Sequence, residues 1–242
     1  MRKILLFWAC ALLLWGDGLK VAVMHTEPWG YYDQSGQVTG IWPEIADAIG
    51  ETSGIAHTLR LTPYARALEG LRNGEADLSY LIRSPDREGE VYHAGFLFNF
   101  ATVVIAHSDL SLTAFEDLEK MRIGVLRGIR ISERFDQNNT LQKIEVRDYE
   151  TMLGMLHAGR LDAVSGNSLS LPYLANQMKS PAQPSLGDRL VLQVTPVTVQ
   201  FSHHHQDATV RARVERAVDA LRKTGRIEAI LNRYAGEAWR VD

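Results

Sequence analysis

The chain is poor in cysteine and in long hydrophobic runs: Cys10 is its only cysteine, and one such run stands near the N-terminus. A single cysteine excludes an internal disulfide framework and a multi-thiolate zinc site. The formal net charge is −3, from 26 basic and 29 acidic residues, and no basic stripe is present. This pattern argues against a nucleic-acid-binding protein. A mean hydropathy of −0.14 argues against a polytopic membrane protein.

The overall composition is that of an ordinary globular protein. The 242 residues are 45% hydrophobic and 23% charged, which excludes collagen-like, disordered and coiled-coil chains. The length is enough for one large domain or two small ones, each with a real hydrophobic core.

The N-terminus has the pattern of a secretory signal peptide over residues 1–18. Two basic residues, Arg2 and Lys3, precede an uninterrupted apolar run of 12 residues, Ile4–Trp15. This run is shorter than the roughly 20 residues of a membrane-spanning helix. Cys10 lies inside the run, so we do not expect a lipid anchor. Cleavage after Gly18 would leave a cysteine-free chain with 24 basic and 28 acidic residues and a charge of −4, which suits an oxidising compartment.

The remaining sequence alternates strand-like and helix-like segments. Hydrophobic spacing and Gly/Pro breaks predict the order strand, helix, strand, helix, strand twice, over residues 19–100 and over roughly 120–190. The predicted strands are Leu19–Met24, Thr58–Leu61, Ala76–Ile82, Phe100–Ala106, Arg122–Leu126, Lys143–Val146, Leu161–Val164 and Leu190–Phe201. The predicted helices are Ile41–Ile49, one from Pro63 to Asn73, one after Gly128, Tyr149–Leu156, Pro172–Met178 and a long region, Val210–Tyr234, broken near Gly225.

This order predicts an α/β fold of two lobes with parallel sheets and helices on both faces. No Gly/Ser/Pro-rich linker separates the lobes, and the two joins, Ala101–Ala106 and Val194–Phe201, are themselves strand-like. Two crossings by stiff strands would make a hinge with an interlobe cleft. Clefts at the carboxyl ends of strands are where α/β proteins bind ligands.

Five segments in order resemble the family-3 extracellular solute-binding proteins, the periplasmic binding proteins of polar amino-acid uptake. The resemblance covers nearly all of residues 19–236. The segments are Pro28-Trp29 with Gly40-Ile41-Trp42-Pro43-Glu44-Ile45, Gly74-Glu75-Ala76-Asp77, Ser84-Pro85-Asp86-Arg87, Ile123-Gly124-Val125-Leu126-Arg127-Gly128 with Gly159-Arg160-Leu161-Asp162-Ala163, and Ala217–Ile230.

The resemblance implies a two-lobe, Venus-flytrap fold of the type II periplasmic binding proteins. By analogy, lobe 1 comprises residues 19–100 plus 198–242, and lobe 2 comprises residues 101–197.

Three ligand contacts follow from the resemblance. The arginine that grips a carboxylate in the family matches Arg87, so Arg87→Ala is expected to abolish binding. The second-lobe carboxylate site matches Gly128-Ile129-Arg130, where the family's hydroxyls are missing and Arg130 either supplies a charge or points outward. The family's aspartate for an α-ammonium matches Asn167. An amide there weakens the case for a standard L-amino acid and favours an acidic or neutral ligand.

Further cleft candidates come from residue type and position. Glu27 either supplies an anion for an amine or is a solvated loop carboxylate. Trp29 offers a ring face for stacking. Tyr80 ends a predicted strand, and Arg66 lies in a Pro-aromatic-x-Arg helix start that resembles a branch of the family. For Trp42, packing in its helix is favoured over a ligand contact. Arg83 either adds a second positive charge for the ligand or is a solvent-exposed residue at the edge of the site.

The run His203-His204-His205 is interpreted as a surface loop and not as a metal site. Adjacent residues of an extended segment point to alternate faces, and metal sites draw ligands from several elements. We expect no metal and no cofactor.

The sequence therefore predicts an exported, monomeric binding protein that captures a small polar ligand, an amino acid or a related carboxylate. Its partner would be a membrane permease or a receptor. One alternative is a periplasmic enzyme of the same fold, dehydratase-like, with Glu27 and His25 near the cleft. The other is a sensory or partner-binding module, which is disfavoured because the chain ends at Asp242, shortly after the closing helices.

Overall fold

A computed structural model describes residues 18–179, 183–237 and 239–240. The strands are β1 (Leu19–Met24), β2 (Tyr31–Tyr32), β3 (Val38–Thr39), β4 (His57–Thr62), β5 (Leu78–Ile82), β6 (Val91–His107), β7 (Arg122–Leu126), β8 (Gln142–Val146), β9 (Ala163–Asn167) and β10 (Leu186–Ser202). The α-helices are α1 (Ile41–Ser53), α2 (Tyr64–Asn73), α3 (Glu133–Gln137), α4 (Tyr149–His157), α5 (Ser170–Gln177), α6 (Ala208–Lys223) and α7 (Arg226–Ala235). Two 3₁₀ turns, η1 (Pro85–Arg87) and η2 (Phe115–Lys120), complete the elements.

Eight strands form one mixed sheet in the order β4-β1-β5-β10-β6-β9-β7-β8. The prediction of parallel sheets is only partly right. Strands β1, β4 and β5 pair in parallel, as do β7, β8 and β9. The long strands β6 and β10 run antiparallel to each other and to their outer neighbours. The chain thus crosses the middle of the molecule twice, in opposite directions.

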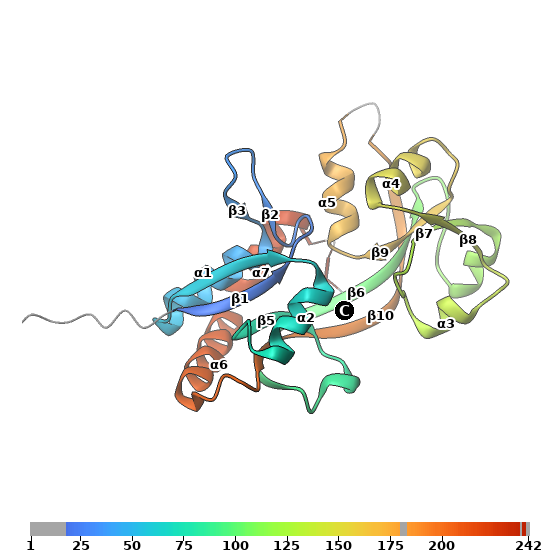
Figure 1. Cartoon of the computed structure of the whole chain (residues 1–242). Helices are drawn as coiled ribbons and strands as arrows, with labels where there is room; N and C mark the ends of the chain where they lie inside the picture. Colours follow the sequence, from blue (N-terminus) through green and yellow to red (C-terminus); the bar gives the residue numbers. More distant parts are fainter. Residues whose placement is uncertain (1–17, 180–182, 238, 241–242) are drawn as a thin grey trace, which may run out of the picture.

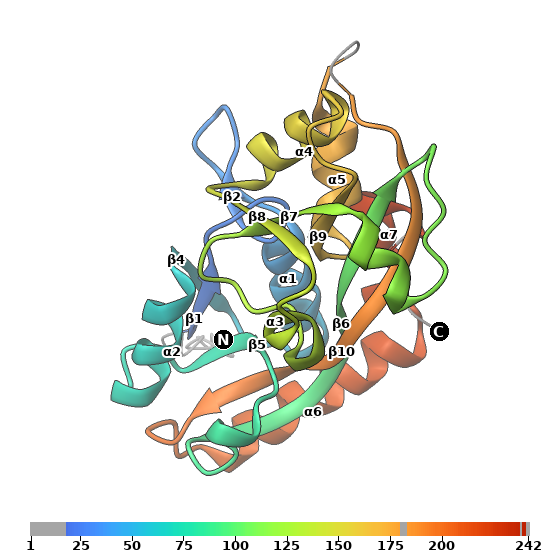
Figure 2. The same ribbon diagram turned by 90° about the vertical axis from the view of Figure 1, so that its right-hand side faces the viewer.

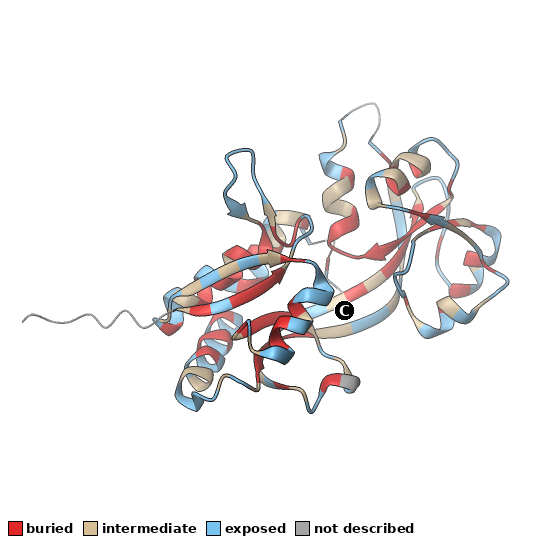
Figure 3. Cartoon of the chain, in the orientation of Figure 1, coloured by how far each residue is buried: buried red, intermediate tan, exposed pale blue. Residues whose placement is uncertain are grey.

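The two crossing strands join two groups of elements that have separate hydrophobic cores (Figures 1 and 2). One core lies between the first strands and helices α1, α6 and α7, with a smaller cluster beneath α2. Two further cores are built within residues 101–192, one beneath α4 and α5 and one around η2 and α3. Figure 3 shows buried residues along the strands and on the helix faces that cover them. The helices cover both faces of the sheet, as the α/β pattern predicts.

Strands β6 and β10 are longer than the sequence indicates. The apolar runs mark only residues 100–106 and 190–201, whereas the strands span Val91–His107 and Leu186–Ser202. Their outer parts contain polar residues and glycines, because one side of each faces solvent. Their pairing is interrupted by register shifts on both sides of the middle, including Val191/Gln193 and Val197/Thr198. Such bulges bend strands and increase their twist.

Helix α1 shows how local sequence determines an element that borders the site. Its first residue follows Gly40, whose φ of 118° is a conformation that favours glycine. A Cβ at this position would also lie 2.8 Å from the Pro28 carbonyl oxygen. Buried residues then recur with helical spacing through Ile45 and Ile49, and the helix ends at the left-handed Gly54.

The same aspartate–backbone hydrogen bond is found at the start of a strand in both groups of elements. Asp77 Oδ2 accepts a hydrogen bond from the backbone N–H of Lys20 at 2.8 Å, at the start of β1. Asp162 Oδ2 accepts one from the backbone N–H of Arg122 at 2.8 Å, at the start of β7. Each aspartate stands three residues after a left-handed glycine that ends a helical segment, Gly74 or Gly159. The repeated strand–helix order in the sequence therefore corresponds to a repeated structural unit.

The predicted signal peptide falls almost entirely on residues 1–17, which lie outside the described residues. Among the residues that the structure describes, no helix is long and apolar enough to span a membrane.

Candidate ligand-binding site

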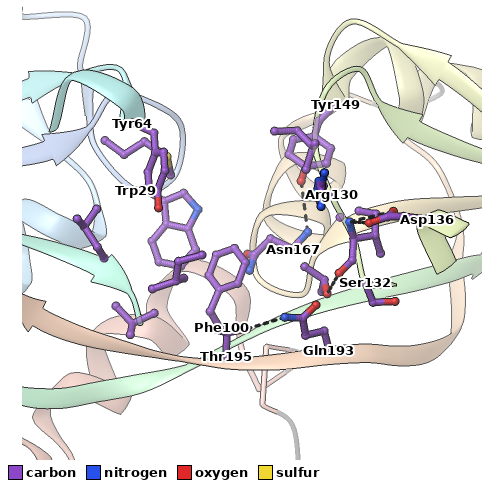
Figure 4. A pocket seen from close by; sticks show the side chains of 18 of the residues that line it. Trp29, Tyr64, Phe100, Arg130, Ser132, Asp136, Tyr149, Asn167, Gln193 and Thr195 are labelled. Carbon is purple, nitrogen blue, oxygen red and sulfur yellow. Dashed lines mark hydrogen bonds between the residues drawn. The ribbon is translucent and has the colours of Figure 1, made fainter. Parts of the chain in front are cut away.

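A cleft of about 860 Å³ lies over the middle of the crossing strands, between the two groups of elements. Its first wall comprises Met24, Trp29, Trp42, Tyr64, Tyr80, Leu81 and Ile82. Its second wall comprises Ile129, Arg130, Ile131, Ser132, Glu133, Asp136, Gln137, Tyr149, Gly166 and Asn167. Its floor, on β6 and β10, comprises Phe100, Thr102, Gln193, Thr195 and Val197. In Figure 4 Trp29 and Tyr64 face Tyr149 and Arg130 across the cleft.

The site forms where parallel strands end. Met24, Ile82 and Asn167 are the last residues of β1, β5 and β9. The carboxyl ends of parallel strands leave side chains and loop backbone free to meet a ligand. The position therefore agrees with the cleft that the strand order predicts.

Trp29 is the centre of a packed aromatic cluster in the first wall. Its ring centroid lies 4.9 Å from that of Trp42, 6.0 Å from that of Phe98 and 5.8 Å from that of Phe100. Only 2% of Trp29 is exposed, so the ring is a rigid part of the wall and not an open stacking platform. Trp42 packs in the core, as expected for a helix residue.

Tyr80 and Tyr64 complete this wall. Tyr80 on β5 is buried, and its hydroxyl has no hydrogen-bond partner among the described residues. Burial, with the charge of Asp47, raises the pKa of this phenol far above its ordinary value. Tyr64, the first residue of α2, is 36% exposed. Tyr64 was not predicted for the site, although it is the aromatic residue of the Pro-aromatic-x-Arg helix start from which Arg66 was proposed.

The second wall begins with the turn that follows β7. Gly128 has a φ of 75°, and the next residue, Ile129, is 56% exposed at the cleft. Arg130 is also exposed, and no hydrogen bond or ion pair joins it to the residues that the structure describes. The segment is held from below, because Thr102 Oγ1 donates to the Ile131 carbonyl oxygen at 2.8 Å.

Asn167 lines the cleft, but its side chain forms hydrogen bonds within the protein. Its Oδ1 accepts hydrogen bonds from the backbone N–H groups of Leu169 at 3.0 Å and Ser170 at 2.9 Å, and from Ser170 Oγ at 3.2 Å. Its Nδ2 donates to the Ala101 carbonyl oxygen at 3.3 Å. Asn167 therefore provides an acceptor for N–H groups at the start of α5, two residues before the N-cap residue Leu169.

Tyr149 and Gly166 fit together at the far end of this wall. A Cβ on Gly166 would lie 2.6 Å from the Tyr149 ring, so the ring needs a glycine here. The Tyr149 hydroxyl accepts a hydrogen bond from the Asn167 backbone N–H at 3.3 Å. Burial raises the pKa of this phenol, and that hydrogen bond opposes the shift.

Arg87 lies behind the first wall and does not line the cleft. It is 9% exposed, and its Nη2 donates to the Ile82 carbonyl oxygen at 2.5 Å. Its Nε is buried without a partner among the described residues. The short β5–β6 connection turns through η1 and brings the guanidinium back under β5. The predicted contact of Arg87 with a ligand stays a prediction, and its geometry here is that of a structural residue.

The Arg83 side chain forms a surface ion pair beside this turn. Its Nε lies 2.6 Å from Glu88 Oε1, and this arginine lowers the pKa of the Glu88 carboxyl. Of the two roles considered for Arg83, the structure shows that of a solvent-exposed residue.

The remaining candidates lie outside the cleft. Arg66 lines a different groove, between α2 and strands β1 and β4. Two residues along a helix turn the side chain by about 200° from Tyr64, so Arg66 points away when Tyr64 faces the cleft. Glu27 is exposed beside Tyr173, and its charge helps to raise the pKa of that phenol, after burial and the hydroxyl of Tyr31. His25 is exposed and packs edge-on against Tyr32.

The three histidines form a surface turn whose side chains diverge. The His203 ring packs on Tyr92, His204 contacts the Arg72 carbonyl oxygen, and His205 contacts Asp77. No group of three or more His, Cys, Asp or Glu side chains that could hold a metal occurs among the described residues.

Known proteins match the chain along most of its length. The sequence model of the bacterial extracellular solute-binding proteins, family 3, matches residues 19–237. A probable amino-acid-binding protein of Bacillus subtilis strain 168, YxeM, is 23% identical over 214 residues, which cover 85% of this chain and 79% of that protein.

Solved structures show the same fold. An ancestral cationic amino acid solute-binding protein, AncCDT-1, superimposes with a TM-score of 0.75 at 18% identity and covers 90% of this chain and 95% of its own. The second substrate-binding domain of Lactococcus lactis GlnP, in an open conformation, gives 0.72 at 17% identity over 91% and 96% of the two chains. The two lobes, the cleft and the family match agree, and the chain belongs to the bacterial extracellular solute-binding proteins, family 3.

Proposed function

We propose that this protein captures a small polar ligand, an amino acid or a related carboxylate, in the cleft between its lobes. The observation that carries the proposal is the cleft itself, whose two walls belong to different lobes and whose floor is formed by the two crossing strands. Both walls present accessible side chains to the same space. Trp29, Tyr80, Ile129, Arg130 and Asn167, predicted from the sequence, are among its lining residues.

The proposed mechanism is capture followed by closure. A ligand first rests against one wall, and bending of β6 and β10 then brings the other wall over it. Closure removes water, which strengthens hydrogen bonds and charge pairs to the ligand. The bulges at Val191/Gln193 and Val197/Thr198 lie on both sides of the middle of β10, where such bending is easiest.

The lobe boundaries of this proposal remain those predicted from the sequence: residues 19–100 with 198–242, and residues 101–197. The distribution of the hydrophobic cores supports them, apart from Leu169 and Val197, which pack with the first core. We propose that the mature protein is a periplasmic monomer, exported by residues 1–18, and that its closed form is recognised by a membrane permease or a receptor.

We further propose that the protein binds its ligand without transforming it, and that no cofactor takes part. Family membership and the name of the Bacillus subtilis relative, a probable amino-acid-binding protein, support binding. The alternative catalytic pair is not favoured, because Glu27 and His25 are exposed and neither lines the cleft.

The first experiment is thermal unfolding of the mature protein after refolding has removed carried-over ligand. Amino acids, organic acids, small peptides and amines are added one by one. A ligand at about 100 times its Kd adds roughly 2.7 kcal/mol to the free energy of unfolding. Substitution of Ile129 by aspartate should remove the stabilisation, whereas Val38→Asp, at an exposed apolar position outside the cleft, should keep it. Turnover of a compound seen by NMR, with no stabilisation by any of them, would favour the enzyme alternative.

A further inference from the structure

We propose that the ligand is a monocarboxylate with an apolar or aromatic body, that Arg130 holds its carboxylate, and that it needs no amine. This inference rests on the proposed function and names the ligand class of the same cleft. It departs from the zwitterion arrangement that the resemblance implies, with Arg87 for the carboxylate and position 167 for the ammonium.

One charged side chain of the cleft is free to bind an anion. Three charged residues are among its described lining residues, Arg130, Glu133 and Asp136, and all three belong to the second wall. Both oxygens of Asp136 accept from the Ile131 backbone N–H at 3.2 Å. Glu133 Oε1 accepts from Gln137 Nε2 at 3.2 Å along α3. Arg130 has no such partner in the described part of the chain, so of these three side chains it is the one whose hydrogen-bonding groups are all free to meet a ligand.

A guanidinium in this position is well suited to a carboxylate. Its planar donors match the two oxygens, and such charge-assisted hydrogen bonds are about twice as strong as neutral ones. Arg87 is not among the described lining residues of the cleft, and its Nη2 donates to the Ile82 carbonyl oxygen.

The oxygen at the position that the resemblance assigns to an ammonium is already used. Asn167 Oδ1 accepts three hydrogen bonds at the start of α5. On the floor, Thr102 donates to the Ile131 carbonyl oxygen, and Gln193 Nε2 donates to Thr195 Oγ1 at 3.3 Å. The first wall contributes no carboxylate to the described lining of the cleft. An ammonium placed against Asn167, as the resemblance implies, would have to displace one of these hydrogen bonds or stay unpaired, and either weakens binding.

The accessible surface of the cleft is mostly apolar on both sides. Ile129 and Tyr64, at 56% and 36% exposure, are among the most exposed large apolar residues that the structure describes, and they line opposite walls. Met24, Ile82 and Phe100 add partly buried apolar surface between them. Burial of apolar area contributes roughly 25 cal/mol per Å². Closure of these walls on an apolar ligand body would bury both surfaces together.

The test is isothermal titration with matched sets of compounds. Each set contains a carboxylate, its α-amino acid and the amine that lacks the carboxylate: hexanoate, norleucine and pentylamine; 3-phenylpropanoate, phenylalanine and 2-phenylethylamine; indole-3-propanoate, tryptophan and tryptamine. Acetate tests the carboxylate alone. In at least one set we expect the carboxylate to bind as tightly as its amino acid or tighter, and at least 100-fold more tightly than the amine.

Two variants assign the binding to Arg130. Arg130→Gln should weaken carboxylate binding by at least 30-fold, about 2 kcal/mol at 25 °C. Arg127→Gln is the matched control, because Arg127 lies three residues earlier, is exposed, and pairs with Glu145 at 3.4 Å outside the cleft. Its affinity should equal that of the unmodified protein.

Other outcomes separate this inference from the function on which it rests. Binding of amino acids at least 10-fold more tightly than of their carboxylates, or binding that Arg130→Gln leaves unchanged, overturns the inference and keeps the binding function. Absence of binding by every compound here and in the thermal screen overturns both.

Discussion

The indole Nε1 of Trp29 donates a hydrogen bond to Ser170 Oγ at 2.9 Å, and this buried bond joins the first wall of the cleft to helix α5. The two residues are 141 positions apart in the chain. Ser170 Oγ in turn donates to Asn167 Oδ1 at 3.2 Å. A continuous chain of side-chain hydrogen bonds therefore runs from the aromatic cluster of one lobe to the start of α5 in the other.

Ser170→Ala should lower the free energy of unfolding by about 1–3 kcal/mol, because it leaves the buried indole N–H without a partner. Urea unfolding followed by tryptophan fluorescence measures the change. The double-mutant cycle with Trp29→Phe isolates the pairwise contribution. A coupling energy of zero in this cycle would show that the hydrogen bond does not stabilise the fold.

Asn167→Ala should destabilise the protein by about 1–3 kcal/mol, because backbone N–H groups at the start of α5 lose their buried acceptor. Asn167→Asp keeps the accepting oxygens but loses the Nδ2 bond to the Ala101 carbonyl oxygen, so we expect it to be destabilised as well and to gain no affinity for amines. Calorimetric titration of both variants with amino acids and amines checks this. A new affinity for amines in Asn167→Asp would contradict this structural role and restore position 167 as an ammonium site.

Arg87→Ala should act on stability more than on binding. The buried guanidinium donates to the Ile82 carbonyl oxygen, and a hydrogen bond to a charged group is worth about 1.5–3 kcal/mol. We expect lower resistance to urea and a smaller loss of affinity than in Arg130→Gln. Arg83→Ala, in an exposed pair with Glu88, is the control and should change neither. Abolished binding at unchanged stability would place Arg87 in the site, as the resemblance implies.

Acid should weaken the second lobe through Asp162. This carboxylate accepts from Arg122 Nε at 2.9 Å and from the Arg122 backbone N–H at 2.8 Å, and these bonds lower its pKa in the folded state. A lowered pKa gives stability that is present above the unfolded pKa, about 3.9, and is lost as the pH falls through the folded pKa.

Asp162→Asn therefore should be less stable than the unmodified protein at pH 7, and the difference should shrink below about pH 4. Urea midpoints across this range measure it. Asp219→Asn, on the exposed side of α6, should show no such trend. A difference that stays constant with pH would mean that the loss comes from packing and not from charge.

Elements with strong local signals could be predicted from the sequence. Helix α2 begins after Pro63 and ends at the left-handed Gly74, where the predicted helix also ends. Strands β1 and β7 have the predicted bounds. The outer halves of β6 and β10 could not be found, because their pairing partners are distant and one side of each strand is solvated.

The candidate site could be predicted only in part. Trp29 follows from its residue type and its place after the first strand, and Ile129 and Arg130 follow from the resemblance of their turn to the second-lobe site of the family. The placement of Arg87 depends on how the η1 turn folds back, which no local pattern encodes. Tyr64 and Tyr149 line the cleft as the first residues of helices. Their contribution depends on which side of each helix faces the floor, and only tertiary packing determines this.

The first hydrophobic core joins the two ends of the described chain. Apart from Leu169, it combines residues between Leu19 and Phe98 with residues between Val197 and Trp239, so α1 packs on α6 and α7. The cores within residues 101–192 use a continuous stretch instead. When the chain is synthesised from its N-terminus, all residues of the second-lobe cores are therefore available before the first-lobe core can be completed. Deletion of the chain from α6 onward should accordingly leave the N-terminal strands without a finished core, while the two cores of the central stretch keep all of their own residues.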